Sequence, residues 1–377
     1  MNFFPPSSRT EAVGRILERM EATADAVRPA FPLAADAETG IWRTAADGRW
    51  AGGFWVGMLW LAHHHTKQAK YASLAREWMS RLAPRIGIDN ILNGLVFYYG
   101  AALGARLADD LQARSLALDG ARALDRRYDQ TTGIFPLGGD TTEITTDAGV
   151  ETNIDGLPGM TLLLWAADAG EEPAFMAHAL SHAYRLLEAC QRSDGSLYQA
   201  AIFNPASGAI ERRFTPRGYA EQSTWARAQS WGLLGFVQAA RWDATLIAAA
   251  RRVADFWIGR TSTDPVAFWD FDDPSIPIVE RDTSATAMAA AALLKLAALM
   301  PEPEDSRRYR THAEVTINKL VHLYLTPTRP DDHRPPGILT EGCWQRNQKM
   351  ATKHELIWGD YFLLEALLQL EGRLPPI

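Results

Sequence analysis

The chain has 377 residues, of which 47% are hydrophobic and 22% are charged, the balance of an ordinary soluble globular protein. Its formal net charge of −7 comes without a basic stripe, which argues against nucleic acid as a partner. No run approaches the roughly 18 apolar residues of a membrane span, and the first residues lack the basic-then-apolar order of a secretory signal, so we expect a cytoplasmic protein with no membrane partner.

Helices are the dominant predicted element along the whole chain. Apolar residues recur with the 3.6-residue period of a helix, and strand-like alternation is scarce. In chain order, helices are predicted over 9–29, 51–66, 70–84, 92–108, 110–128, 154–169, 174–191, 224–240, 244–260, 282–299, 304–326 and 355–371. One β-hairpin is predicted within 195–214, where NPASG forms a turn between two alternating segments.

The predicted helices alternate between two kinds. One kind is apolar nearly all round, as in GGFWVGMLWLA at 52–62, and the other is amphipathic, as in TEAVGRILERMEATADAVR at 10–28. Helices that are apolar all round are buried, whereas amphipathic helices lie at the surface. Six such pairs predict a closed (α/α)6 barrel, one all-α domain over 1–377. An open helical solenoid is the alternative, but it would repeat at a fixed period, which this chain does not do.

Long polar connections precede several of the buried-type helices. Because long ordered loops on one face of a rigid scaffold usually carry function, we expect the functional site at that rim of the barrel.

Asp155 stands at the start of one of the apolar helices, in VETNIDGLPGMTLLLWAADAG at 150–170. An Asp near a helix N-terminus often caps the unsatisfied backbone N–H groups. Alternatively, the carboxyl group faces a cavity and transfers a proton to or from a substrate. Both interpretations are open at this point.

Arginine and tryptophan accompany Asp155 at the predicted rim. The polar candidates are Gln199, Arg217, Arg227, Asp282, Lys349, Lys353 and His354, and the aromatic ones are Trp42, Trp50, Phe54, Trp55, Trp225, Trp231, Trp269, Trp344 and Trp358. Arg binds carboxylates with two parallel hydrogen bonds, and aromatic faces stack on sugar rings. This combination indicates a pocket for an anionic sugar.

Several of these residues also have a purely structural interpretation. Arg227 lies in a buried-type helix, where it needs either a bound anion or a buried ion pair. Asp282 is a good N-cap candidate for the helix that follows it. Asp360 is expected to be structural, in an ion pair inside the barrel.

Metal and nucleotide sites are not indicated. The consecutive His63, His64 and His65 point in different directions from a helix, and Cys190 and Cys343 lack metal-site or disulfide spacing. No GxxxxGK[ST], GxGxxG or GxSxG motif occurs. We therefore expect no cofactor and no metal.

Six fragments in order resemble the unsaturated glucuronyl hydrolases, glycoside hydrolase family 88. They span nearly the whole chain: RWAGGFWVGMLWLA, ETNIDGLPGMTLLLWAA, RSDGSLYQ, GYAEQSTWARAQSWGLLGF, RDTSATAMAAAALLKLA and GCWQ…HELIWGDYFLLEALL. The resemblance implies an (α/α)6 barrel, in agreement with the helix pattern. It also implies a small oligosaccharide substrate that ends in an unsaturated uronate, as polysaccharide lyases leave it.

The implied chemistry is the hydration of a vinyl ether and needs neither metal nor cofactor. A carboxylic acid protonates C4 of the unsaturated sugar, water adds at C5, and the resulting hemiketal breaks down and releases the remaining glycan. The acid in the family's I-D-x-L motif corresponds to Asp155. The Arg and Trp of its T-W-x-R-G-Q-x-W motif correspond to Arg227 and Trp231, which the resemblance implies hold the uronate and its ring.

The chain departs from the family pattern around the expected pocket. Gln199 stands where the family has His, Arg217 replaces a Gln, and Ala228 replaces a Gly. The family's H-D-x-G-F motif, which supplies a second Asp, reads ILNGLVF here. That Asp falls at Leu92 or Asn93, with Asp89 slightly earlier, so we expect Asn93 or Asp89 beside Asp155.

These departures keep two other functions open. One is a related barrel enzyme that acts on a different uronide or glycoside, and the other is a non-catalytic protein that binds an anionic sugar. Trp50, Trp344 and Lys353 are further candidates for substrate binding in every case. The oligomeric state is not indicated by the sequence.

Overall fold

Helices make up most of the computed structural model, which describes residues 6–139, 149–170, 172–325 and 337–375. The α-helices are α1 (Pro6–Val27), α2 (Gly52–Thr66), α3 (Ala69–Ser80), α4 (Asn93–Phe97), α5 (Leu103–Ala108), α6 (Leu111–Asp125), α7 (Thr161–Asp168), α8 (Ala174–Cys190), α9 (Ala226–Ala239), α10 (Ile247–Arg260), α11 (Thr283–Leu299), α12 (Pro303–Leu323) and α13 (Ile357–Leu370). Short helical turns are η1 (Ala83–Gly87), η2 (Tyr98–Ala102), η3 (Ile154–Met160), η4 (Ala244–Leu246) and η5 (Arg346–Gln348). The strands are β1 (Phe31–Ala35), β2 (Trp42–Ala45), β3 (Val150–Asn153), β4 (Ala200–Phe203), β5 (Ile210–Phe214) and β6 (Glu355–Leu356).

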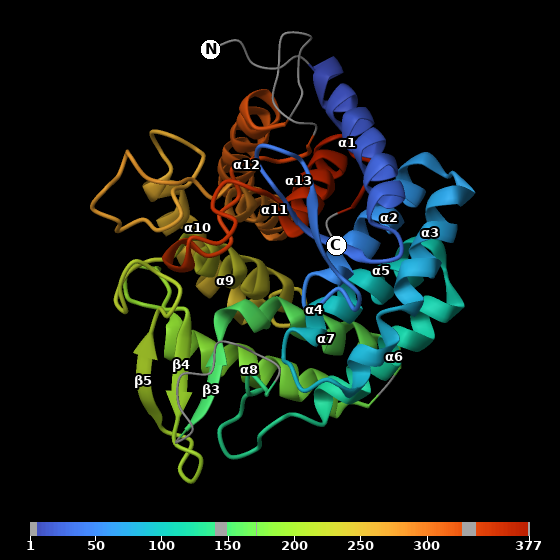
Figure 1. Cartoon of the computed structure of the whole chain (residues 1–377). Coiled ribbons are helices and arrows are strands. Elements are labelled where there is room, and N and C mark those ends of the chain that lie inside the picture. The colour runs from blue at the N-terminus through green and yellow to red at the C-terminus, as the bar shows by residue number, and fades with distance from the viewer. Residues whose placement is uncertain (1–5, 140–148, 171, 326–336, 376–377) are drawn as a thin grey trace.

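The apolar helices form a closed inner ring. In chain order its members are α2, the α4–η2–α5 segment, the η3–α7 segment, α9, α11 and α13; each contacts the next, and α13 contacts α2. The amphipathic helices α1, α3, α6, α8, α10 and α12 lie outside this ring, against their inner partners (Figure 1). The predicted (α/α)6 barrel is confirmed.

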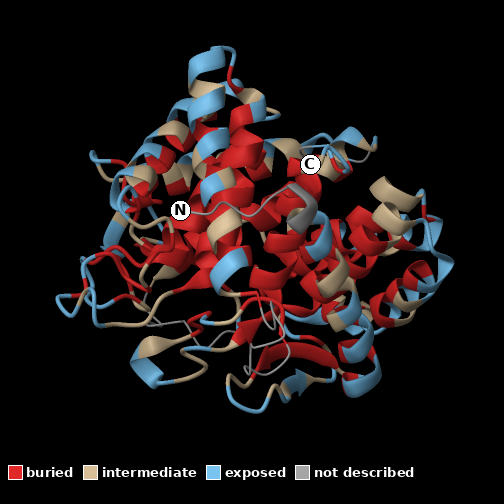
Figure 2. Cartoon of the chain, turned by 90° about the horizontal axis from the view of Figure 1, so that it is seen from above, coloured by how far each residue is buried: buried red, intermediate tan, exposed pale blue. Residues whose placement is uncertain are grey.

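Burial follows the two kinds of helix. Every residue from Gly52 to Ala62 of α2 is buried, whereas α6 buries only one face, through Ala113, Ala117, Gly120, Ala121 and Leu124. Figure 2 shows the same division, with buried residues at the centre and exposed residues at the periphery. The hydrophobic pattern of each helix therefore sets its place in the barrel.

Two glycines bring the backbones of α4 and η3 into direct contact. A Cβ atom added at Gly94 would lie 2.6 Å from the carbonyl oxygen of Gly159 and 2.8 Å from its Cα. Any side chain here would push the two segments apart. The contact therefore fixes Leu92 and Leu95, at the start of this inner segment, next to the turn that carries Asp155.

The strands form two small antiparallel sheets, in the orders β2-β1-β6 and β3-β4-β5. The predicted hairpin is confirmed as β4 and β5. The remaining strands were not predicted, because they have two to five residues each and, like the fully buried FPLAA of β1, lack alternation.

Two predicted helices differ in detail from the structure. The segment predicted as one helix over 92–108 contains a π turn, η2, between α4 and α5. The segment predicted over 154–169 begins with the 3₁₀ turn η3, whose sequence IDGLPGM contains Pro158 and two glycines that do not favour a regular α-helix.

A buried pair of carboxyl groups joins α13 to the segment before β6. Asp360 is fully buried, and its Oδ1 accepts a hydrogen bond from the Leu339 backbone at 3.0 Å. Its Oδ2 is buried without a hydrogen-bond partner among the described residues, and the neighbouring carboxylate of Glu355 is ion-paired with Arg19 at 2.9 Å. Asp360 is therefore structural, as predicted, but Glu355 and not Asp360 carries the ion pair. Burial, and the charge of Glu355, raise the pKa of Asp360 well above its usual range.

This raised pKa predicts how Asp360→Asn changes stability with pH. Above pH ~4 the unfolded chain releases the Asp360 proton and the folded protein keeps it, so rising pH favours unfolding until the folded-state pKa is passed. The Asn variant lacks this penalty. We expect the free energy of unfolding of the variant, relative to that of the parent, to rise by up to about 1.4 kcal/mol per pH unit over this interval. Urea unfolding at a series of pH values measures the difference.

The matched control for this experiment is Asp25→Asn, which changes an exposed aspartate of α1. Its stability difference from the parent should be independent of pH. A difference for Asp360→Asn that is equally flat would show that Asp360 is ionised in the folded protein.

Candidate active site

A cavity and a pocket adjoin each other at the rim of the barrel. The outer cavity, with a volume of about 600 Å3, is lined by Arg43, Asp47, Arg49, Trp50, Arg85, Asn90, Leu92, Gly139, Arg217, Trp344, Gln345, Gln348 and Met350. The inner pocket, of about 20 Å3, is lined by Trp50, Leu92, Leu95, Asp155, Arg217, Trp225, Arg227 and Trp231. Trp50, Leu92 and Arg217 belong to both walls, so the outer cavity leads to the inner pocket.

The sheet β3-β4-β5 brings three predicted site residues together. Asn153 at the end of β3 pairs with Ala200 at the start of β4, and Ala200 pairs with Phe214 at the end of β5. Asp155, Gln199 and Arg217 lie within three residues of this row, at one end of the sheet. Residues far apart in the sequence therefore meet, because antiparallel pairing sets their register.

The side chain of Asp155 faces the inner pocket. Asn153, not Asp155, caps η3, because the Asn153 side chain accepts a hydrogen bond from the Gly156 backbone at 3.1 Å. Asp155 is 7% exposed and is the only carboxylate in the wall of the inner pocket, as far as the chain is described. Of the two interpretations of Asp155, this arrangement fits the one in which it faces a cavity.

Gln199 holds one oxygen of Asp155 in a fixed direction. Its Nε2 donates a hydrogen bond to Oδ2 of Asp155 at 3.0 Å, and its Oε1 accepts one from the backbone N–H of Arg217 at 3.0 Å. The second bond fixes which end of the amide is the donor, since a backbone N–H can only donate. Gln199 is fully buried, and it acts on Asp155 as a donor that does not titrate.

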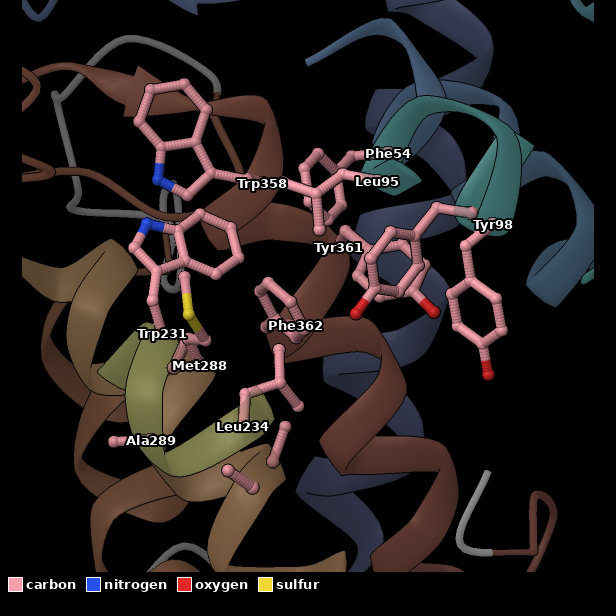
Figure 3. Close-up of a cluster of buried hydrophobic side chains, with 14 of the residues drawn as sticks. Phe54, Leu95, Tyr98, Trp231, Leu234, Met288, Ala289, Trp358, Tyr361 and Phe362 are labelled. Atoms are coloured by element: carbon pink, nitrogen blue, oxygen red, sulfur yellow. The ribbon is translucent and has the colours of Figure 1, made fainter. Parts of the chain in front are cut away.

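Tryptophans form much of the apolar surface of both walls, together with Leu92, Leu95 and Met350. Trp50, Trp225 and Trp231 line the inner pocket, and Trp50 and Trp344 line the outer cavity. Beneath them lies an aromatic cluster in which Phe362 packs against both Trp231 and Tyr361 (Figure 3). The other predicted aromatic partners, which do not line either wall in the described chain, are Trp42, Phe54, Trp55, Trp269 and Trp358.

Arg227 lines the inner pocket but is already ion-paired. Its Nη1 lies 2.8 Å from Oδ2 of Asp282, and both side chains are buried. Its guanidinium also donates to the backbone carbonyls of Cys343 and Trp344. Asp282 caps α11 as predicted, accepting from the Ser284 and Ala285 backbones. Arg227 thus brings hydrogen-bond donors to the pocket, while Asp282 balances its charge.

Neither Asn93 nor Asp89 lies in the described walls of the cavity or the pocket, contrary to expectation. The Asn93 amide accepts from Nε of Arg85 and donates to the backbone oxygens of Arg85 and Ile88, so it turns away from Asp155. The Asp89 carboxylate is mostly exposed and ion-paired with Arg127. Leu92, the other position at which the family's second Asp could fall, lines the inner pocket together with Asp155. The place expected for a second acid is therefore apolar.

Lys353 does not lie where the sequence analysis placed it, and several polar residues of the outer cavity were not predicted. Lys353 is exposed and does not line either wall in the described residues. The sequence did not single out the following residues of the outer cavity: Arg43, Asp47, Arg49, Arg85, Asn90, Gln345 and Gln348. The segment IWRTAADGRWA, a polar connection before an inner helix, contains Arg43, Asp47 and Arg49. Its position in such a connection could have indicated that these residues lie at the site.

The described parts of the chain contain no group of three or more His, Cys, Asp or Glu residues that could hold a metal ion. Within the same parts, every helix is too short or too polar to cross a membrane. The groups that the site offers to a substrate are the side chains of the two walls.

An (α/α)6 barrel with a carboxyl group in a tryptophan-lined pocket at its rim fits a carbohydrate-active enzyme, because a carboxyl group can transfer a proton and aromatic side chains can pack on a sugar ring. Sequence comparison agrees. An unsaturated glucuronyl hydrolase of Bacillus sp. (strain GL1) is 32% identical over 329 residues, which cover 85% of this chain and 86% of that protein. An unsaturated chondroitin disaccharide hydrolase of Streptococcus pneumoniae is 27% identical over 369 residues, covering 95% and 91%. No family model matches the chain.

Solved structures show the same relationship. The structure of the unsaturated glucuronyl hydrolase from Bacillus sp. GL1, described as responsible for glycosaminoglycan degradation, superposes with a TM-score of 0.89 at 30% identity, covering 96% of this chain and 97% of that one. A complex of an Asp-to-Asn variant of such an enzyme with dGlcA-Glc-Rha-Glc gives the same TM-score and identity, covering 96% of both chains. The chain belongs to the unsaturated glucuronyl hydrolase family, and it is an enzyme of the glycoside hydrolase type.

Proposed function

We propose that this enzyme hydrolyses oligosaccharides whose non-reducing end is an unsaturated uronate, with Asp155 as the acid that protonates C4. The names of the relatives support this substrate class, and so does the saccharide in the related complex, which begins with dGlcA. The observation that carries the proposal is the one carboxyl group in the described wall of the inner pocket, which is held by Gln199 and shares that wall with Trp50, Trp225 and Trp231.

The presence of one carboxyl group in the described wall of the inner pocket favours hydration over ordinary glycosidic cleavage. Most glycosidases use two carboxyl groups on either side of the scissile bond. Here Leu92 and Leu95 line the inner pocket together with Asp155, and Asp47, the carboxylate in the described wall of the outer cavity, is ion-paired with Arg85 at 2.6 Å. Hydration of a vinyl ether needs one acid, because the C4=C5 bond itself supplies the reactive electrons. Asp155 suffices for that step.

The proposed reaction balances without a cofactor. Asp155 gives its proton to C4, a water molecule forms a bond to C5, and the proton lost by that water returns to Asp155. The hemiketal at C5 opens to a ketone and leaves a hemiacetal at C1. Breakdown of the hemiacetal breaks the bond between C1 and the glycosidic oxygen, which departs with the rest of the saccharide.

Arg217 is the side chain best placed to bind the uronate carboxylate. It lines both the outer cavity and the inner pocket, and its backbone N–H donates to the Gln199 amide that holds Asp155. The inner pocket has room for about one water molecule, so a sugar ring can lie beside Asp155 only after a lining side chain has moved. Arg217 is half-buried, and we propose that it moves as it takes hold of the carboxylate.

The test of this function is direct. The enzyme should abolish the ultraviolet absorbance of an unsaturated uronosyl disaccharide and release the second sugar, because hydration removes the conjugated double bond. The matched saturated disaccharide should stay intact. Release of the second sugar from the saturated compound, with the unsaturated one untouched, would instead indicate a conventional glycosidase, and binding of both without products would indicate a sugar-binding protein.

A further inference from the structure

A buried aspartate, Asp270, has no part in the reaction proposed above. It lies in the connection between α10 and α11 and is fully buried. A carboxylate is costly to bury unless hydrogen-bond donors surround it. Three donors do so here, and two of them belong to another segment, residues 215–223 between β5 and α9, which we name the Arg217 loop.

Asp270 binds the Arg217 loop at two points. Its Oδ2 accepts hydrogen bonds from the Tyr219 backbone N–H at 2.8 Å and from the Ser223 hydroxyl at 2.7 Å. Its Oδ1 accepts from the Asp272 backbone N–H at 2.9 Å, within its own segment. Because a carboxylate accepts stronger hydrogen bonds than a neutral group, these contacts fix the loop against the connection that follows α10.

The Arg217 loop also packs closely on Asp270 at a glycine. A Cβ atom added at Gly218 would lie 2.9 Å from Oδ2 of Asp270. On another side, the carbonyl oxygen of Gly218 accepts a hydrogen bond from Nδ2 of Asn347 at 2.8 Å. The backbone directly after Arg217 is therefore held between two segments that are distant in the sequence.

The backbone of Arg217 connects this clamp to Asp155. Its N–H donates to Oε1 of Gln199 at 3.0 Å, and Nε2 of Gln199 donates to Oδ2 of Asp155 at 3.0 Å. An amide whose oxygen is held by a backbone donor turns its NH2 group toward the carboxylate. The orientation of the Asp155 carboxyl group therefore depends on where the loop places the Arg217 backbone.

We propose that Asp270 is a positioning residue for the acid Asp155, and that it acts through the Arg217 loop and Gln199. This inference rests on the proposed function, since it takes Asp155 as the proton donor. Catalytic steps depend steeply on geometry, and a displacement of about 1 Å can lower a rate by about 10²-fold. A loop released from Asp270 would free the Gln199 amide and, with it, the carboxyl group of Asp155.

Asp270→Leu removes both acceptors with little change of shape. We expect kcat on an unsaturated uronosyl disaccharide, corrected for the folded fraction, to fall by about tenfold to hundredfold. Asp273→Leu is the matched control, because Asp273 is buried in the same connection but its described hydrogen bonds, from Trp269 Nε1 and the Ser275 backbone, do not reach the loop. The corrected kcat of this control should change by less than about twofold. Circular dichroism gives the folded fraction of each protein.

Ser223→Ala tests the clamp while the charge of Asp270 stays in place. It removes one of the two loop donors through a small change that the fold should tolerate, and we expect kcat to fall by about threefold. Amide hydrogen exchange over residues 215–223 reports on the loop without any need for activity. Exchange should be faster in Asp270→Leu and Ser223→Ala and unchanged in Asp273→Leu.

The same changes in a Gln199→Met background test the route to Asp155. The link is already broken there, so Asp270→Leu and Ser223→Ala should lower kcat by less than about a further twofold. Equal losses of kcat in both backgrounds would overturn the proposal, and so would unchanged exchange, or faster exchange with no loss of kcat. A parent enzyme that leaves the double bond intact would overturn the proposed function itself, whereas normal parent turnover with unaffected variants overturns only the positioning role.

Discussion

Replacement of Asp155 by Asn is expected to lower kcat on an unsaturated uronosyl disaccharide by roughly 10²–10⁴-fold, because the side chain loses the proton that it gives to C4. The change keeps the shape of the residue and an oxygen that can accept from Gln199, which lies 3.0 Å from the carboxylate. The affinity for the disaccharide should therefore stay within about threefold of the parent. Loss of the double-bond absorbance measures kcat, and calorimetry measures the affinity.

Asp47→Asn is the control variant that shows whether the loss of activity is specific to Asp155. Asp47 is the other carboxylate in the described walls of the cavity and pocket, but it is ion-paired with Arg85 and does not line the inner pocket. Its replacement should affect the affinity for substrate more than kcat. A kcat that survives Asp155→Asn and falls with Asp47→Asn would move the acid to the outer cavity.

The architecture was predictable because the pattern of apolar residues within each helix shows whether that helix is buried or lies at the surface. Helices apolar all round, such as α2, had to lie inside, and amphipathic ones, such as α6, outside. The closed ring followed from their alternation. The short strands were less predictable, because β3 and β6 gain their hydrogen bonds from partners that are distant in the sequence.

The candidate site was predictable only in part. Asp155 and Gln199 stood out by residue type, yet their contact depends on the pairing of β3 with β4. The error at Asn93 has a simple cause: consecutive helical residues point about 100° apart, so the sequence could not decide whether Leu92 or Asn93 faces the pocket. The structure decides for Leu92.

Three of the arginines in the described wall of the outer cavity were missed for a different reason. Arg43, Arg49 and Arg85 come from β2, from the turn before α2 and from η1. Nothing in their local sequence shows that these segments meet Arg217 across one cavity. Likewise, the choice between an ion pair and a ligand for Arg227 depended on Asp282, which is 55 residues away in the chain.

Arg227→Met is expected to cost about 3–5 kcal/mol of unfolding free energy, because it leaves the buried Asp282 without its partner. The carbonyls of Cys343 and Trp344 also lose a donor, and an unsatisfied buried acceptor adds to the cost. For a chain of this length the loss corresponds to a fall of roughly 4–6 °C in Tm. Asp282→Asn should be costly for the same reason, since it leaves Arg227 charged and buried.

The double variant Arg227→Met/Asp282→Asn distinguishes an ion pair from two independent roles. If the two side chains stabilise the fold mainly through each other, the double variant should be less destabilised than the sum of the single variants, because no uncompensated charge remains. Arg308→Met, which breaks an ion pair with Asp255 whose side chains are 46% and 45% exposed, should cost at most about 1 kcal/mol. A stable Arg227→Met protein whose KM for the unsaturated disaccharide rises steeply would show instead that Arg227 serves the ligand. In that case the hydrogen bond from Arg227 to the backbone carbonyl of Trp344 would contribute little to the stability of the fold.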